Sequence, residues 1–327
     1  MSDLVIRPMK AGEEGAHENL LFQSYREYAG SDPQHFLAQR ENYHCLGCDP
    51  RGKPEHTRLL FCGDELVSAL TVFLWPIRFR AGVLLAGLVG GVCTHPDYRR
   101  RGHVRQLMED AIAFMRGQAV TVSWLYGKQS VYGPSGYGAF TRYAVLEAHS
   151  LPPPEAGIRV RPLAPGRDLK EVQTLYETWN SRTFGPPLRM EEDWTRRILD
   201  RRVRHGGIAH YYAVEDAGGR MIAYCQILPD ADRSIGEFGA RDDACAARAL
   251  AAAAQHTGGQ LHFWFDHPGV ERSLKSAKAA VSRAYVSHGM WRVIDGSRLG
   301  LPRGAGPAGL FRLLEADRFV YYQADHF

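Results

Sequence analysis

Apolar and polar residues recur along the chain in patterns that predict a mixed α/β fold. Residues 83–93 are almost wholly apolar, which is typical of a strand buried on both faces. A basic turn at residues 99–102 separates this strand from a helix, and polar residues occupy one face of that helix. Its other face is apolar at helical spacing, through Val104, Leu107, Met108, Ala111, Ile112 and Met115. The pattern therefore predicts a buried strand, a basic turn and an amphipathic helix in succession.

Further elements flank this central unit on both sides. Before it we predict strands over residues 4–9, 58–62 and 65–80 and helices over 18–28 and 32–43. After it we predict strands over residues 121–126 and 139–148, separated by the glycine-punctuated segment 131–137. The run Leu151-Pro152-Pro153-Pro154 cannot sustain ladder hydrogen bonds, so we place a domain boundary there.

The second half repeats this order in outline, without a repeated motif. We predict strands over 158–162, 260–265 and 284–286, helices over 168–200, 244–255 and 270–276, and a hairpin over 209–227. A glycine-rich connector at 304–309, a short helix and an aromatic strand-like stretch at 318–323 close the chain. We therefore expect α/β domains with mixed sheets over residues 1–150 and 155–295, followed by a short C-terminal extension over 296–327.

Composition and charge narrow the function classes. The 327 residues carry 40 Lys and Arg against 36 Asp and Glu, a net charge of +4, which argues against a dedicated nucleic-acid or membrane binder. The chain shows neither a secretory leader nor a run of 18 or more apolar residues, so we expect a cytosolic protein. Six cysteines are sparse for this length and are read as reduced thiols.

The candidate chemistry lies in the segment from Gly90 to Arg105. A strand that runs through a basic, glycine-containing turn into a helix N-terminus can seat a pyrophosphate, because its amide N–H groups and the helix dipole favour an anion. Arg99, Arg100, Arg101 and Arg105 add complementary charge. The backbone of Val92, Cys93 and Thr94, at the end of the strand, could stabilise a carbonyl oxygen that gains charge.

This segment resembles the acetyl-CoA-binding motif R/Q-x-x-G-x-G/A of GNAT acetyltransferases. Arg99 and Gly102 match the motif, whereas Val104 stands where Gly or Ala is usual. The resemblance implies a GNAT domain that takes acetyl-CoA as acetyl donor. Beyond the arginines and strand residues already named, the cofactor-binding residues that it implies are Gly102, His103, Val104, Gly127 and Lys128.

A second stretch, Val131 to Gly138, resembles the Y-x-x-x-G-Y/F signature of the same superfamily, where the leading Tyr is commonly the general acid. That position is Tyr132 here. An unperturbed phenol, with a pKa of about 10, holds its proton until a thiolate of pKa about 8.5 forms. The alternative for Tyr132 is an ordinary core aromatic, as we expect for Tyr126 and Tyr137.

Together with a second half that lacks a cofactor motif and with a C-terminal Phe, these motifs resemble the Eis group of acetyltransferases. Members carry two tandem GNAT domains and a sterol-carrier-like domain, for which residues 296–327 are too few. The resemblance implies a homo-oligomer that acetylates a primary amine, either of an aminoglycoside-like small molecule or of a lysine side chain. It also implies that the terminal carboxylate of Phe327 accepts the amine proton; a packed chain end is the alternative.

Two rival functions remain open. A non-catalytic acyl-CoA-binding regulatory protein would suit Val104 and the short C-terminal part, whereas Tyr132 opposes it. His44, Cys45, Cys48 and His56 have a spacing that could hold Zn²⁺, but one C-x2-C pair is a weak signal, and the alternative is reduced cysteines in a loop. We therefore expect no bound metal.

Overall fold

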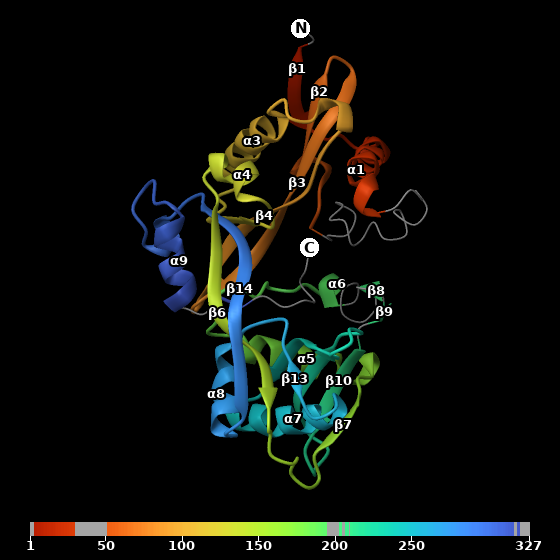
Figure 1. The fold of residues 1–327 in the computed structure, drawn as a ribbon, viewed down its shortest axis with the longest axis vertical. Coiled ribbons are helices and arrows are strands. Elements are labelled where there is room, and N and C mark those ends of the chain that lie inside the picture. Colours follow the sequence, from red (N-terminus) through yellow and green to blue (C-terminus); the bar gives the residue numbers. More distant parts are fainter. Residues whose placement is uncertain are drawn as a thin grey trace.

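The computed structural model describes residues 3–29, 51–194, 203–204, 207–208, 210–316 and 319–320. Within these residues it contains a mixed sheet of eight strands, an antiparallel sheet of four strands and one short two-stranded ladder of β8 (Val203–Arg204) and β9 (Gly207–Ile208). Helices pack against both larger sheets. In Figure 1, β1 to β4 lie in the upper part and β7 and β10 in the lower part, and the long strands β6 and β14 run from one part into the other. The mixed α/β class predicted from the sequence is confirmed.

The eight-stranded sheet has the order β1-β2-β3-β4-β5-β14-β6-β13. Among the described residues β4 and β5 form its one parallel pair, and the other neighbours are antiparallel. Its strands are β1 (Leu4–Pro8), β2 (Thr57–Cys62), β3 (Glu65–Phe79), β4 (Gly82–Thr94), β5 (Val122–Leu125), β6 (Gly138–His149), β13 (Leu261–His262) and β14 (Ala280–Val293).

Two helices cover opposite faces of the β2, β3 and β4 part of this sheet. Successive strand residues point to opposite faces, so Leu59 packs with α1 (Glu14–Ala29) whereas Leu60 packs with α3 (His103–Gly117). Ala69 and Leu70 divide in the same way. Both faces of the central strands are therefore dry, as the apolar run at 83–93 predicted.

The last long strand of the chain completes the sheet begun by the first half. β14 inserts between β5 and β6, and β6 and β14 run side by side through the middle of the molecule (Figure 1). The sequence predicted only a three-residue strand at 284–286, which is too short, because β14 has 14 residues. Gly289, with φ +77°, lies against Trp124 and the Leu125 carbonyl, where a β-carbon would overlap both. The division into domains at residues 1–150 and 155–295 stays a prediction. Because β14 pairs with β5 and β6, one sheet contains strands from both of these proposed domains.

The second sheet has the order β12-β11-β10-β7 and repeats the beginning of the first. In both halves a strand and a helix are followed by three antiparallel strands and a helix, although α6 and the β8–β9 ladder lie between α5 and β10 in the second half. The elements of the second half are β7 (Arg159–Pro162), α5 (Pro165–Trp179), α6 (Glu191–Asp193), β10 (His210–Glu215), β11 (Met221–Ile227), β12 (Ile235–Ala240), α7 (Asp243–His256) and α8 (Pro268–Ser276). β12 was not predicted, and β13 is shorter than the predicted strand 260–265.

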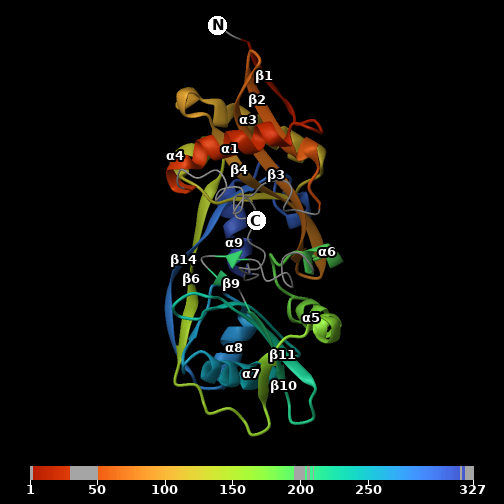
Figure 2. The same cartoon turned by 90° about the vertical axis from the view of Figure 1, so that its right-hand side faces the viewer.

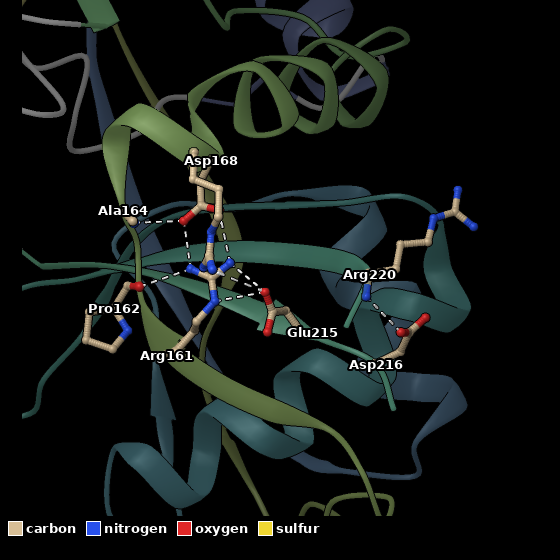
Figure 3. Close-up of polar contacts among 8 residues, drawn as sticks. Arg161, Pro162, Ala164, Asp168, Glu215, Asp216 and Arg220 are labelled. Carbon is tan, nitrogen blue, oxygen red and sulfur yellow. Dashed lines mark hydrogen bonds and ion pairs between the residues drawn. The ribbon is translucent and has the colours of Figure 1, made fainter. Parts of the chain in front are cut away.

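An arginine fork repeated in both halves strengthens the likeness. Arg161 at the end of β7 binds Asp168 at the start of α5 through two hydrogen bonds of 2.6 and 3.0 Å, and Asp168 also accepts from the Ala164 amide (Figure 3). In the first half, Arg7 of β1 binds Glu13 through bonds of 2.8 and 2.6 Å. The Lys10 amide donates to the same carboxylate at 2.8 Å. Each pair ties the first strand of its half to the entry of the first helix.

The C-terminal extension forms a helix and packs on the sheet. α9 (Pro307–Ala316) buries Leu310 and Leu314 against the Trp124, Phe140 and Trp291 cluster. Figure 1 shows α9 beside β14 and β6. The predicted connector 304–309 is therefore too long, because residues 307–309 are helical. The predicted helix 32–43 and most of the stretch 318–323 lie outside the described residues.

Candidate active site

The two parallel strands at the centre of the large sheet separate before they end. β4 pairs with β5 only from Ala86↔Val122 to Leu88↔Trp124. β4 continues over residues 89–94, and its ladder with β3 is irregular between Ala69 and Thr71. Gly91 takes a φ of +59° in this stretch. Beyond Leu88, β4 thus has no strand partner on its β5 side among the described residues, and the sheet opens there.

The basic turn follows directly from this open stretch of β4. It contains the short helix η4 (Pro96–Tyr98) and two left-handed residues, Arg100 at φ +62° and Gly102 at φ +82°. Tyr98 anchors the turn, since its hydroxyl donates to Glu65 at 2.6 Å. Gly102 is the N-cap of α3 and provides no side-chain cap. The amides in the first turn of a helix have no hydrogen-bond partner within the helix. In α3 these amides follow an exposed glycine.

The space around Gly102 indicates whether a diphosphate fits at this turn. A β-carbon built on Gly102 would meet nothing within 4 Å, so open space lies in front of the helix N-terminus. The positive φ favours glycine there independently of space. His103, the first helical residue, is buried, and neither of its ring nitrogens has a hydrogen-bond partner in the described chain. Burial, and secondarily Arg101, lower its pKa, so the ring stays neutral at pH 7. The turn fits an anionic group.

The four predicted phosphate-binding arginines are exposed, but they are not equivalent. Arg99 donates to the Ser24 carbonyl of α1 at 2.7 Å, and Arg101 donates to the Asp97 carbonyl at 2.8 Å. Arg105 pairs with Glu109 on the next turn of α3 at 3.1 Å. Arg100 has no side-chain bond among the described residues. Among the described residues, Arg100 is thus the guanidinium of this turn that an anion could engage without breaking a side-chain hydrogen bond or ion pair.

Val104, the departure from the motif, packs partly buried against the core that contains Leu107 and Met108. Its branched side chain therefore helps to pack α3 against the rest of this core. Lys128 is exposed and is the N-cap of α4 (Gln129–Tyr132).

Tyr132 belongs to the same core cluster as Val89 of β4. It ends α4, is 9% exposed, and stacks edge-on to Tyr137 at 6.5 Å. Burial raises the pKa of Tyr132 to about 12, and the Cys93 thiol adds a smaller effect in the same direction. The ring lies against Gly127, where a β-carbon would fall 2.6 Å from Cδ2. The structure thus brings Tyr132, Gly127 and the β4 segment together.

A chain of hydroxyl groups ties the two strands together where they still pair. The Ser123 hydroxyl donates to the Gly87 carbonyl at 2.7 Å and lies 2.6 Å from the Tyr137 hydroxyl. Tyr137 is buried, as expected, whereas the prediction that Tyr126 is a core residue is wrong, because Tyr126 is 45% exposed at the end of β5. Tyr126 therefore lies where the sheet opens.

The end of β4 is held by side chains of other elements. The Val92 carbonyl accepts a hydrogen bond from Tyr25 of α1 at 2.7 Å, and the Cys93 carbonyl accepts one from Ser68 at 2.7 Å. Thr94 shares its hydroxyl with Ser68 at 2.8 Å. Burial raises the pKa of the Cys93 thiol to about 12, so it stays protonated. Sequence reasoning missed Tyr25, because an aromatic residue on an amphipathic helix looks like a core residue.

Several predicted residues lie outside the described chain. Phe327 is one of them, and so are His44, Cys45 and Cys48 of the possible zinc site. His56 is described and packs against Phe114, with ring centroids 5.7 Å apart. Among the described residues, no group of three His, Cys, Asp or Glu could hold a metal ion. In the same residues, no helix combines the length and the apolar character that crossing a bilayer requires.

Residues 25–140 match the family model of the acetyltransferase (GNAT) domain. By sequence, no curated protein matches the chain.

Among solved structures, the chain is similar to a GCN5-related N-acetyltransferase from Kribbella flavida, with a TM-score of 0.67 and 17% identity over 90% of this chain and 72% of the other. A GCN5-related N-acetyltransferase from Anabaena variabilis gives a TM-score of 0.66 at 15% identity, over 90% and 73%. Eis1 from Mycobacterium abscessus gives 0.60 at 14% identity, over 90% and 74%. At such identities the likeness establishes the fold, which is that of these acetyltransferases.

Proposed function

We propose that the protein transfers an acetyl group from acetyl-CoA directly to a primary amine. The observation that carries the proposal is the opening between β4 and β5 after Leu88. The Gly102 turn follows β4, and Tyr132 packs in the same core cluster as Val89 of that strand. The match of residues 25–140 to an acetyltransferase domain supports it. The function proposed for the whole chain goes beyond that match.

Each part of the opening has one task in this reaction. Acetyl-CoA supplies the activated thioester. The first-turn amides of α3, together with Arg100, hold its diphosphate, because helix N-termini and guanidinium groups both favour phosphate oxygens. The other turn residues, Arg99, Arg101, His103 and Arg105, shape the turn and add positive charge. Backbone groups of the segment from Val92 to Thr94 stabilise the negative charge that grows on the thioester oxygen.

Proton transfer completes the chemistry. As the amine nitrogen bonds to the acetyl carbon and the carbon–sulfur bond breaks, the sulfur takes a proton from Tyr132. A hydroxyl with a pKa of about 12 remains protonated at neutral pH and is available for that step. The amine proton passes to the terminal carboxylate of Phe327, directly or through water. The carboxylic acid formed at Phe327 then releases its proton to solvent, and the phenolate left on Tyr132 takes one up from solvent.

The remaining proposals concern the family, the assembly and the acceptor of the protein. We assign the protein to the Eis-like acetyltransferases, with the second half shaping the acceptor pocket and contributing to a homo-oligomer in the cytosol. The acceptor is an aminoglycoside-like amine or a lysine side chain. The repeated arginine fork at Arg7 and Arg161 supports two tandem domains of one type.

Release of free thiol from acetyl-CoA, measured across a panel of small amines and lysine peptides, tests the proposal. Amine-dependent thiol release is expected. Tight binding of acetyl-CoA without turnover for any amine would instead favour the alternative function, a regulatory protein that binds acyl-CoA.

A further inference from the structure

A hollow lies at the opposite end of α3 from the proposed cofactor turn. It has a volume of about 750 Å³ and is formed where the end of α3, the end of β14 and the start of α9 meet. A space of this size is within the range of sites for small organic molecules. Its charged lining residues are Arg116, Arg292, Arg303 and Asp295.

The three arginines have no carboxylate partner among the described residues. Arg292 donates to the Ser135 carbonyl, a neutral acceptor, and its Nε is buried without a hydrogen-bond partner. Arg116 and Arg303 are exposed and make no ion pair in the described chain. Burial lowers the pKa of Arg292; Tyr137 acts in the opposite direction, and Arg116 adds a smaller lowering effect because two positive charges repel each other.

The single acidic residue of the hollow does not neutralise them. Asp295 accepts a hydrogen bond from the Ser297 amide at 3.0 Å. That bond and the Ser297 hydroxyl lower the pKa of Asp295, with a smaller effect from Arg298, which is not part of the lining. The hollow therefore carries an excess of positive charge in a concave space, where a bound anion is attracted most strongly.

The rim adds backbone donors. The segment from Arg303 to Pro307 contains Gly304 and Gly306 and leads into the N-terminus of α9, where the helix dipole favours negative charge. Gly304 takes a φ of +80°. Three guanidinium groups that line one hollow are suited to phosphate oxygens, which they can bind in forks.

We propose that this hollow binds a small organic phosphate, separately from acetyl-CoA. The two sites are distinct, because Arg116 follows Gly102 by 14 residues of α3, or about 21 Å along the helix. The hollow also takes most of its lining from residues 292–307, which the first-half motifs do not include.

Calorimetric titration of inorganic pyrophosphate into the full chain tests this site. Coenzyme A is kept at saturating concentration, so that the turn at Gly102 does not contribute. Three proteins are compared: the wild type, the double variant Arg116→Gln with Arg303→Gln, and the control Arg312→Gln, an exposed arginine of α9 outside the lining. We expect binding to the wild type and the control, and an affinity lower by about tenfold or more in the double variant, which loses two charge-assisted contacts.

Three results would overturn the proposal. They are the absence of pyrophosphate binding to the wild type, equal affinity in all three proteins, and an equal loss in the Arg312→Gln control, which would indicate a diffuse charge effect. The comparison among variants identifies the hollow even if coenzyme A fails to bind, so the proposal stands or falls independently of the acetyltransferase function.

Discussion

The ring of Tyr132 lies against the α-carbon of Gly127, so closely that a β-carbon at position 127 would fall 2.6 Å from Cδ2 of the ring and nearer still to Cε2. Gly127 follows β5 and Tyr132 ends the next helix, so this contact sets how far the phenol reaches toward β4. The absence of a side chain at Gly127 is therefore part of the positioning of the proposed general acid.

Gly127→Ala should consequently displace Tyr132 and slow acetyl transfer. A displacement of about 1 Å can lower a rate on the order of 100-fold, and we expect a loss of that size in kcat with a smaller change in acetyl-CoA affinity. Gly117→Ala is the matched control, because a β-carbon there meets nothing within 4 Å. Steady-state kinetics of both variants measure the effect. A fully active Gly127→Ala protein would mean that the position of Tyr132 does not matter.

Tyr132→Phe removes the hydroxyl and keeps the ring packing. We expect kcat to fall on the order of 100-fold while the affinity for coenzyme A stays nearly constant, because the hydroxyl acts only as a proton donor. Tyr285→Phe, at an exposed tyrosine of β14 outside the proposed site, is the control. Equal losses of turnover and of coenzyme A affinity would contradict the general-acid role.

The pH profile of the wild type gives a separate test of the same residue. Burial and the Cys93 thiol disfavour the phenolate and raise the pKa of Tyr132 to about 12, so the hydroxyl is protonated at every pH well below that value. The rate should therefore show no decline that depends on Tyr132 up to about pH 10, where an unperturbed phenol would already be half ionised. If the rate instead declined near pH 10 in the wild type and not in Tyr132→Phe, the pKa of Tyr132 would not be raised by burial.

The arginine forks predict how stability depends on pH. Burial alone would raise the pKa of Asp168, but hydrogen bonds from Arg161, the Ala164 amide and Arg167 outweigh it and lower that pKa to about 2. Because the folded value lies below the unfolded value of about 3.9, the stabilisation is complete above the unfolded value and is lost as the pH falls toward 2.

Asp168→Asn should therefore lower the free energy of unfolding at pH 7, on the order of 2 kcal/mol, and the difference from the wild type should shrink toward pH 2. Thermal unfolding between these pH values measures it. Asp232→Asn, at an exposed residue outside the network, should leave the curve unchanged. A constant difference at all pH values would show that the ionised carboxylate contributes nothing.

The terminal carboxylate of Phe327 can be tested apart from its side chain. Deleting Phe327 moves the carboxylate by one residue and should depress the rate, whereas Phe327→Ala keeps the carboxylate in place and should preserve it. Kinetics at saturating acetyl-CoA compare the two. An unchanged rate after deletion would assign the chain end a structural role.

The central unit was predictable from sequence because its signals are local. The apolar run 83–93 and the spacing from Val104 to Met115 depend only on burial and helical period, and β4 and α3 follow them within two residues. The position of Tyr132 beside the opening follows from its place after β5.

Long-range features could not be predicted in the same way. The middle of β14 is exposed around Tyr285, which is 75% exposed, so it lacks the apolar alternation of a half-buried strand. Its partners β5 and β6 lie more than 100 residues earlier in the chain. The Arg-Pro pairs at Arg7 and Arg161 are too short to stand out as a repeat until their carboxylate partners are seen. Sequence also placed four arginines at the turn, but not the contacts that occupy three of their side chains.

Binding of coenzyme A to the turn before α3 is the claim on which the function depends, and calorimetry of the wild type against Gly102→Ala tests it most directly. A β-carbon at position 102 would enter the open space in front of the helix, on a backbone with φ +82° that disfavours it. We predict one coenzyme A per chain for the wild type and an affinity weaker by about tenfold or more for the variant. No heat of binding in the wild type, or equal affinities in the two proteins, would contradict the account.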